Sequence, residues 1–133
     1  MQFLRHLDIS SNDIGDIGAA AVIQNCGGLT SLELNSTNMT SSGLSSLSSH
    51  LSAKSARIKL CCLNLSRNLI GDKAMDQLCA AISSNTQLQS INLSGCGLGN
   101  AGARRLLSLV QSIKHSRAVS HRRHLLQVPV PCL

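Results

Sequence analysis

The chain has 133 residues, room for one domain at about 150 residues per domain, and a multidomain enzyme is therefore excluded. It contains 22 leucines and nine isoleucines but a single aromatic residue, so we expect an aliphatic core and almost no stacking site for bases or sugars. The formal net charge of +6 is uneven: residues 1–76 carry six basic and six acidic side chains, whereas residues 77–133 carry six basic and no acidic ones, which suggests an acidic partner.

Two features of the chain indicate an intracellular protein. No apolar run approaches the roughly 20 residues of a membrane-spanning helix, and the segment MQFLRHLDIS has no basic region followed by an apolar stretch. The six cysteines fall within an apolar pattern and do not frame small loops, so we expect reduced and buried thiols. They are Cys26, Cys61, Cys62, Cys79, Cys96 and Cys132.

Taken in chain order, four segments repeat one frame, L-x-x-L-x-L-x-x-N/C/T, with isoleucine allowed for leucine. They are LRHLDISSN from Leu4, LTSLELNST from Leu29, LCCLNLSRN from Leu60 and LQSINLSGC from Leu88, at spacings of 25, 31 and 28 residues. The alternation by two within each frame predicts a strand whose leucines lie on one face.

A helical pattern follows each frame. Small residues stand six places after the frame, and aliphatic residues then recur four apart, which predicts a helix. The small residues are Gly18, Gly43, Ala74 and Gly102. Two places before them are Asp16, Ser41, Asp72 and Asn100, whose side-chain oxygens can cap free N–H groups, so we expect each helix to begin there.

The frame and its helix resemble leucine-rich repeats of the ribonuclease-inhibitor type over residues 3–111. The resemblance implies an α/β solenoid of about four repeats, with a curved parallel sheet on the concave side and helices on the convex side. It also implies a ladder in which the residue closing each frame bonds the backbone of the adjoining turn. Those residues are Asn12, Thr37, Asn68 and Cys96, and the shorter Thr37 side chain is expected to form a weaker rung.

A narrower resemblance is carried by the 25-then-31 spacing, the SLEL strand at residues 31–34, and the segment LNLSRNLIGDKAMDQLC at residues 63–79. These features are similar to the C-terminal leucine-rich repeats of Tonsoku-like proteins. That family consists of nuclear scaffolds that act with a partner subunit in repairing replication forks. The resemblance implies a nuclear fragment or short form of such a scaffold, without the histone-reading ankyrin repeats.

The residues that alternate with the buried leucines point into the hollow of the predicted solenoid. We predict that this concave face binds a protein, although the same small polar groups would also serve simply to keep an exposed sheet soluble. Hot-spot residues of the Trp, Tyr and Arg types are absent from it. The predicted face consists of His6, Asp8, Ser10, Ser31, Glu33, Asn35, Cys62, Asn64, Ser66, Ser90, Asn92 and Ser94.

The residue patterns oppose enzymatic, metal and cofactor functions. Asp8 and Glu33 fall on adjacent strands, but nothing in the hollow would bury one and raise its pKa, so we interpret them as a solvated edge. Cys61 and Cys62 alternate across the sheet, one toward the core and one exposed, without a histidine to act as base. No cofactor is expected, because the glycines of GCGLGNAG fall at turns of the repeat. No metal site is expected either, because the spacing of His115, His121, His124 and Cys132 fits no standard zinc site.

Residues 112–133 lack a fifth frame, and their two prolines oppose helix and internal strand, so a basic tail that is poorly ordered or loosely docked is expected after a solenoid of residues 1–111. Its apolar residues Leu125, Leu126 and Val128 are the candidates to cover the far end of the stack. The expected basic patch is Arg104, Arg105, Lys114, Arg117, Arg122 and Arg123. It would contact nucleic acid weakly or remain solvated without a ligand. Because neither end carries a polar cap, the isolated chain is expected to be marginally stable or to self-associate.

The sequence therefore predicts a non-catalytic leucine-rich repeat module that binds an unidentified protein, in the nucleus or alternatively in the cytoplasm. The alternatives are a nucleic-acid-binding accessory acting through the basic half, a cytoplasmic regulatory repeat protein, and a truncated product without a partner. Charge reversal at Arg122 and Arg123 would distinguish the nucleic-acid alternative from concave-face binding.

Overall fold

The computed structural model describes residues 4–25, 27–52, 59–85 and 87–116, with side chains as far as Gln111. Strands and helices alternate along this part of the chain. Their bounds are β1 His6–Asp8, α1 Gly15–Asn25, β2 Ser31–Glu33, α2 Ser41–Ser52, β3 Cys62–Asn64, α3 Met75–Ser84, β4 Ser90–Asn92 and α4 Asn100–Ser116. The predicted α/β order of strand, turn and helix, four times over, is confirmed.

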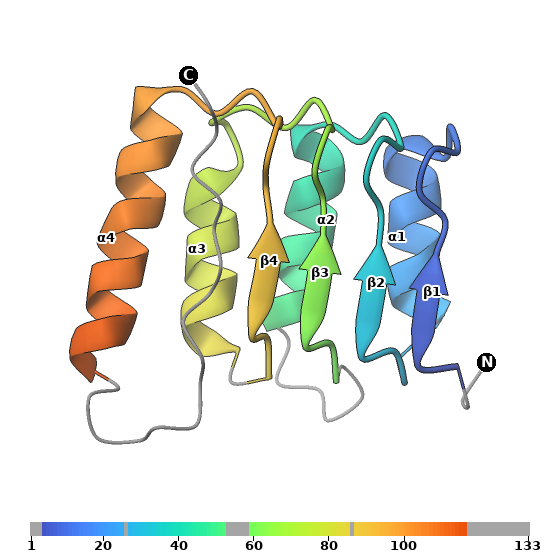
Figure 1. The fold of residues 1–133 in the computed structure, drawn as a ribbon, viewed down its shortest axis with the longest axis horizontal. Coiled ribbons are helices and arrows are strands. Elements are labelled where there is room, and N and C mark those ends of the chain that lie inside the picture. Colours follow the sequence, from blue (N-terminus) through green and yellow to red (C-terminus); the bar gives the residue numbers. More distant parts are fainter. Residues whose placement is uncertain (1–3, 26, 53–58, 86, 117–133) are drawn as a thin grey trace.

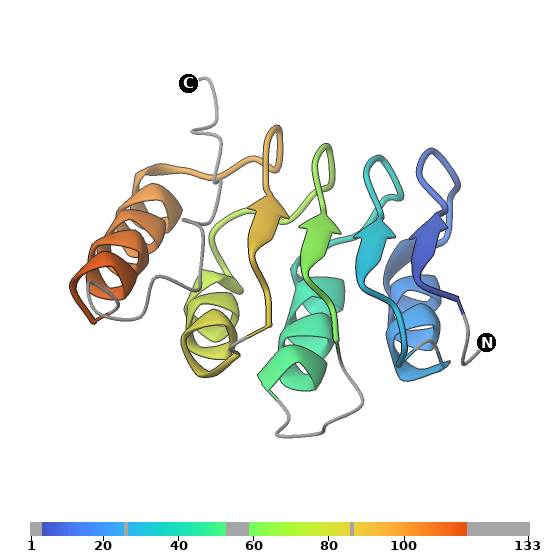
Figure 2. The same cartoon turned by 60° about the horizontal axis from the view of Figure 1, so that its bottom comes forward.

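The four strands form one parallel sheet in chain order, β1-β2-β3-β4. Its register aligns equivalent positions of the frame, so that Leu7, Leu32, Leu63 and Ile91 form one continuous row. Figure 1 shows the helices side by side on one side of this sheet, and Figure 2 shows the units fanning into a curved stack with the strands on the inner side. This is the predicted solenoid with a concave sheet.

The core lies between the sheet and the helices, and leucine dominates it. Leu32, Leu63 and Ile91 are at most 2% exposed, because each is covered by a neighbouring repeat on both sides or by its helix. The first repeat differs: Leu7 is only partly buried. Other apolar residues of that repeat are partly buried as well, namely Leu4, Ile9, Ile14 and Val22.

The helix starts depart in part from the prediction. Helices α2 and α4 begin at Ser41 and Asn100 as expected, and α1 begins at Gly15, one residue before Asp16. Helix α3 begins at Met75, three residues after Asp72, and the residue before it, Ala74, makes no side-chain capping bond. The capping interpretation is therefore wrong for α1 and α3, because the carboxylates of Asp16 and Asp72 bond the following repeat, as described below.

The last helix reaches Ser116, past the predicted boundary between residues 111 and 112. The remainder of the predicted tail, with Leu125, Leu126 and Val128, lies outside the described residues. Within the described residues, no helix is long and apolar enough to cross a membrane.

Candidate functional site

The concave face consists of three rows of side chains that run across the four repeats. Parallel pairing places His6 beside Ser31, Ser31 beside Cys62 and Cys62 beside Ser90, and it aligns the next row in the same way. That second row is Asp8, Glu33, Asn64 and Asn92, and the third, just past the strand ends, is Ser10, Asn35, Ser66 and Ser94. All twelve residues are exposed or partly exposed. The structure thus brings every residue of the predicted face onto one surface.

The second row also closes the turn that ends each strand. Asp8 Oδ1 accepts the backbone N–H of Ser10 at 3.0 Å, and Asn64 and Asn92 accept the N–H groups of Ser66 and Ser94 in the same way, at 3.0 and 2.9 Å. The bond from Ser10 is the main cause that lowers the pKa of the Asp8 carboxyl below its ordinary value. These side chains are consequently held in fixed orientations before any partner arrives.

Glu33 is the exception in the second row, because its longer side chain reaches sideways to the next repeat. Its Oε2 accepts a hydrogen bond from Asn64 Nδ2 at 2.7 Å, and Asn64 Oδ1 in turn accepts Ser66 Oγ at 2.7 Å. A connected polar group therefore crosses the middle of the face from repeat two to repeat three. The adjacent carboxylates of Asp8 and Glu33 each have a hydrogen-bond partner of their own, Ser10 for Asp8 and Asn64 for Glu33.

Of the paired cysteines, Cys62 is exposed as strand alternation predicts, and neither is fully buried, which differs from the general expectation of buried thiols. Cys62 is exposed on the concave face, and Cys61 is half-buried with Sγ 3.4 Å from the carbonyl of Lys59. A strand residue that alternates with the core leucines points to solvent whatever its hydrophobicity. Cys79 and Cys96 are buried, and these four cysteines are free thiols; Cys26 and Cys132 lie outside the described residues.

The ladder residues lie behind the concave face, where they bond successive turns together. Asn68 is 2% exposed, and its Oδ1 accepts the N–H groups of Thr37 and Met39 at 3.1 and 3.0 Å. Its Nδ2 donates to the carbonyls of Leu34 and Leu65, both at 2.8 Å. Asn68 thereby satisfies backbone groups of two repeats at once.

The side chains of the other ladder residues are each described by fewer hydrogen bonds to the backbone than that of Asn68. Cys96 donates its thiol hydrogen to the carbonyl of Leu65 at 3.1 Å, and burial raises the pKa of this thiol, which keeps the hydrogen in place. The Thr37 hydroxyl lies 2.8 Å from the carbonyl of Leu34 in its own repeat. Asn12, which is exposed, bonds the carbonyls of Ile9 and Ser10 within the first repeat.

Sequence reasoning missed a second set of bonds between repeats. Asp16 accepts the N–H and hydroxyl of Thr40 at 2.7 and 2.6 Å, and Asp72 accepts the N–H of Gly99 at 2.8 Å. Each carboxylate thus holds the turn that leads into the following helix, instead of capping its own. The negative charge near that helix start is favourable because free N–H groups gather there.

The same carboxylates contact the glycine of the second and fourth repeats, whereas a Cβ on Gly18 of the first repeat would collide with Ile14. A Cβ on Gly43 would collide with Asp16 Oδ1, and a Cβ on Gly102 would collide with Asp72 Oδ1. Ala74 occupies this position in the third repeat, where the preceding repeat has Ser41 in place of an aspartate. Glycine thus follows a repeat with aspartate, and alanine follows a repeat with serine. This pattern in the sequence could have indicated the contact between repeats.

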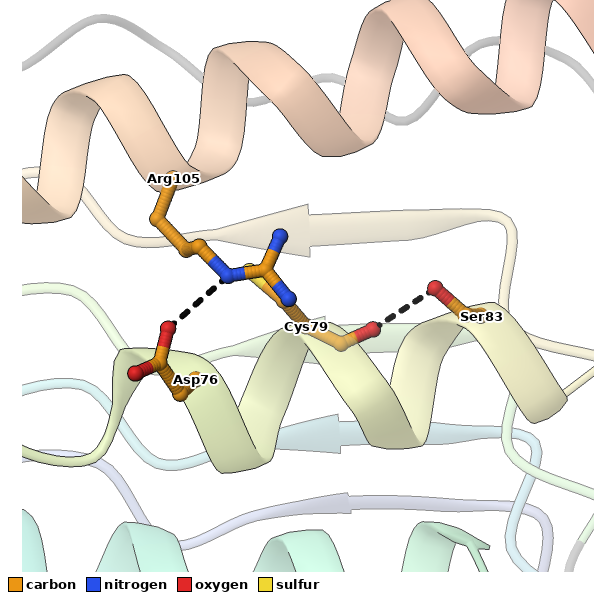
Figure 3. Close-up of polar contacts among 4 residues, drawn as sticks. All are labelled: Asp76, Cys79, Ser83 and Arg105. Carbon is orange, nitrogen blue, oxygen red and sulfur yellow. Dashed lines mark hydrogen bonds and ion pairs between the residues drawn. The ribbon is translucent and has the colours of Figure 1, made fainter.

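On the convex side, one arginine of the predicted basic patch forms an ion pair. Figure 3 shows Arg105 reaching from α4 over α3, where its Nε bonds Asp76 Oδ1 at 2.8 Å beside Cys79. The Cys79 thiol is buried, which raises its pKa, and the carbonyl of Cys79 accepts Ser83 Oγ at 2.9 Å. Arg105 therefore joins two repeats, while Arg104 is exposed on α4.

The structure describes the remaining basic residues of the predicted patch only in part, and the same holds for the histidines that were rejected as a zinc site. Lys114 and His115 lie in α4, where only their backbone is described. Arg117, Arg122 and Arg123 lie outside the described residues. His121 and His124 lie outside them too. In the described part of the chain, no group of three or more His, Cys, Asp or Glu side chains could hold a metal ion.

A shallow groove of about 400 Å³ between α2 and α3 is the alternative surface on the convex side. It is lined by Ser48, Ser49, Ser52, Gln77, Ala80, Ala81 and Ser84. The Ser48 and Ser84 hydroxyls bond carbonyls of their own helices, at 2.7 and 3.0 Å. These two hydroxyls are engaged within their helices.

Comparison with known families agrees with this geometry. A family model of the leucine-rich repeat matches residues 1–22, 29–48 and 84–107. A comparison with curated proteins finds no significant match. The structure adds the repeat between the second and third matched segments, because β3 pairs in register with both β2 and β4. The chain is an α/β leucine-rich repeat solenoid of about four repeats, a class that generally serves as a non-catalytic protein-binding module.

Proposed function

We propose that this chain is a non-catalytic interaction module that binds a protein segment across its concave face. The supporting observation is the registration of twelve exposed or partly exposed side chains in three rows over four parallel strands. Strands in a sheet lie about 4.8 Å apart, so each row presents hydrogen-bonding groups at a regular interval. An extended segment of a partner can meet several of them in succession.

The chemistry of the rows favours a polar partner. The face holds carboxylates, amides and hydroxyls, and it holds no aromatic or arginine anchor of the kind that dominates tight interfaces. A hydrogen bond of this type contributes about 1 kcal/mol, so affinity has to come from many simultaneous contacts. The fixed orientation of Asp8, Asn64 and Asn92 reduces the entropy that binding would otherwise cost.

The test compares capture of a protein from nuclear extract by the whole chain and by variants at the centre of the face. Glu33→Arg and Asn64→Arg should each abolish capture, because they replace the central hydrogen-bonded group with a long cation. The matched controls are Ser46→Arg and Gln24→Arg, which add the same charge at exposed positions of α2 and α1. Capture that survives both central variants, or that is lost equally in the controls, would contradict the proposal.

We further propose that the module acts in the nucleus as part of a scaffold for repairing replication forks. The support is the likeness of the SLEL strand and of residues 63–79 to the C-terminal repeats of Tonsoku-like proteins. A fluorescently tagged chain should then accumulate in the nucleus and gather at stalled forks, and the Glu33→Arg variant should fail to gather there. A uniform cytoplasmic distribution would favour a cytoplasmic regulatory repeat protein instead.

A further inference from the structure

The concave face is acidic, although the chain as a whole is basic. With histidine counted as neutral, two of its twelve residues are charged, and both are carboxylates, Asp8 on β1 and Glu33 on β2. In the part of the chain that the structure describes, neither carboxylate forms an ion pair, and the pair of Arg105 with Asp76 lies on the convex side. The face therefore presents negative charge that the described residues do not neutralise.

The fold does not require the charge of either residue. Each strand-end turn needs an acceptor for a backbone N–H, and the amides of Asn64 and Asn92 supply one at 3.0 and 2.9 Å, as the carboxylate of Asp8 does at 3.0 Å. Parallel pairing places Glu33 at the equivalent position between Asp8 and Asn64. An amide oxygen could also accept the bond that Asn64 donates to Glu33. The two negative charges are thus left for a partner.

The charge of the chain changes sign along the stack. Residues 4–52, which contain the first two strands and helices, hold four acidic side chains and one lysine or arginine. Residues 59–116, which contain the third and fourth, hold two acidic side chains and six lysines or arginines. On the concave face itself, the third and fourth repeats carry cysteine, asparagine and serine. A segment that crosses the face therefore meets negative charge over the first two repeats only.

We propose that the protein segment bound by the concave face is basic where it crosses the first two repeats and uncharged where it crosses the third and fourth. This inference rests on the proposed function and adds the chemistry and the direction of the partner. Lysine or arginine side chains of the segment meet Asp8 and Glu33, and small polar side chains meet Asn64 and Asn92. Complementary charges fix the register of an interface more than they add affinity, so they determine which way the segment runs.

The test presents a pool of random ten-residue peptides to the immobilised full chain and identifies the peptides that are retained. Lysine and arginine should be enriched toward one end of these peptides. The net charge of +6 attracts acidic peptides through the overall field, so a selection of basic ones has to arise locally at the face. Fluorescence anisotropy then measures the affinity of the most enriched peptide for the full chain and its variants.

Two variants remove the charges and keep the hydrogen-bond acceptors. Asp8→Asn and Glu33→Gln should each lower the affinity for the enriched peptide about threefold, and together about tenfold, which is the range of exposed ion pairs. Asparagine already closes the same turn in the third and fourth repeats, so Asp8→Asn should retain it. The matched control is Asp76→Asn, which removes a carboxylate from the exposed side of α3 and should leave the affinity unchanged. Far-ultraviolet circular dichroism verifies that each variant is folded.

Retained peptides without basic residues would overturn this proposal, and so would an affinity that the two neutral variants leave unchanged. Asn64→Arg separates it from the proposed function, because this variant should abolish the binding of any peptide on the face. Uncharged peptides that are lost with Asn64→Arg would contradict the charge argument alone. The absence of retained peptides, or binding that Asn64→Arg leaves intact, would contradict both. Self-association that Asn64→Arg abolishes would make a second copy the occupant instead.

Discussion

Asn12 and Asn68 close the frame in the first and third repeats, yet their surroundings differ. Asn68 is buried and bonds backbone groups of its own repeat and of the one before it. Asn12 is exposed and bonds two carbonyls of its own turn. The difference teaches that a residue in a stacked fold derives its energetic importance from the preceding repeat as much as from its own.

The largest difference in stability is expected when the side chains of Asn68 and Asn12 are removed in turn. Asn68→Ala would leave the buried N–H groups of Thr37 and Met39 without partners, at about 1–3 kcal/mol for each unsatisfied group, and would remove one of the donors to the carbonyls of Leu34 and Leu65. We expect a loss of about 3–5 kcal/mol in the free energy of unfolding, whereas Asn12→Ala should cost less than about 1 kcal/mol. Urea denaturation followed by circular dichroism measures both, and equal losses would contradict the role of the neighbouring repeat.

The row of central strand residues offers a second comparison. Leu63 is 2% exposed and Leu7 only partly buried, although they align in the same row of the sheet. Leu63→Ala should therefore destabilise the fold by about 3 kcal/mol and Leu7→Ala by about half as much. A thermal unfolding series would show the difference, and a larger loss at Leu7 would mean that the first repeat is covered in solution.

The aspartate that reaches into the next repeat can be tested through the glycine it contacts. Gly102→Ala gains roughly 1 kcal/mol of helix propensity but collides with Asp72, so we expect a net loss of about 1–2 kcal/mol. In the double variant with Asp72→Ala, the two losses should not add, because the collision is gone.

Gly95→Ala is the matched control for Gly102→Ala. Gly95 has a φ of +66°, but a Cβ there meets nothing closer than 3.5 Å, and Ser36 and Arg67 occupy the same backbone region in other repeats. Its expected cost is about 1 kcal/mol, from the left-handed conformation alone. Additive losses at Gly102 and Asp72 in the denaturant series would refute the steric explanation.

The smallest expected effect concerns the strand-end turn of the first repeat. The folded pKa of Asp8 is lowered, so its contribution to stability is present above the ordinary pKa of the carboxyl and is lost as pH falls through the lowered value. Exchange of the Ser10 amide should accelerate over that acidic range, after correction for intrinsic exchange, and Asp8→Ala should remove this dependence. Nuclear magnetic resonance of the Ser10 amide follows it directly.

The sequence predicted the sheet well because its register follows from the frame itself: residues at the same place in each frame align in adjacent strands. It could not reveal what Asp16 and Asp72 do, because capping is a local expectation and their partners lie in the following repeat. The exposure of Cys62 follows from strand alternation, which outweighs the general tendency of cysteine to be buried. The bonds from Asn68 to backbone groups of the second repeat could not be predicted in detail, because they depend on how closely the two repeats pack and no local pattern specifies that distance.

Residue-resolved amide hydrogen exchange tests most directly the claim that each repeat is held by its neighbours. Ile9, Leu34 and Leu65 occupy equivalent positions, and their amides donate to Glu33, Asn64 and Asn92 of the next strand at 3.2, 2.8 and 2.9 Å. Ile9 should exchange faster than Leu34 and Leu65, because Ile9 is only partly buried whereas the other two residues are 0% exposed. Exchange at Ile9 as slow as at Leu65 would contradict the account.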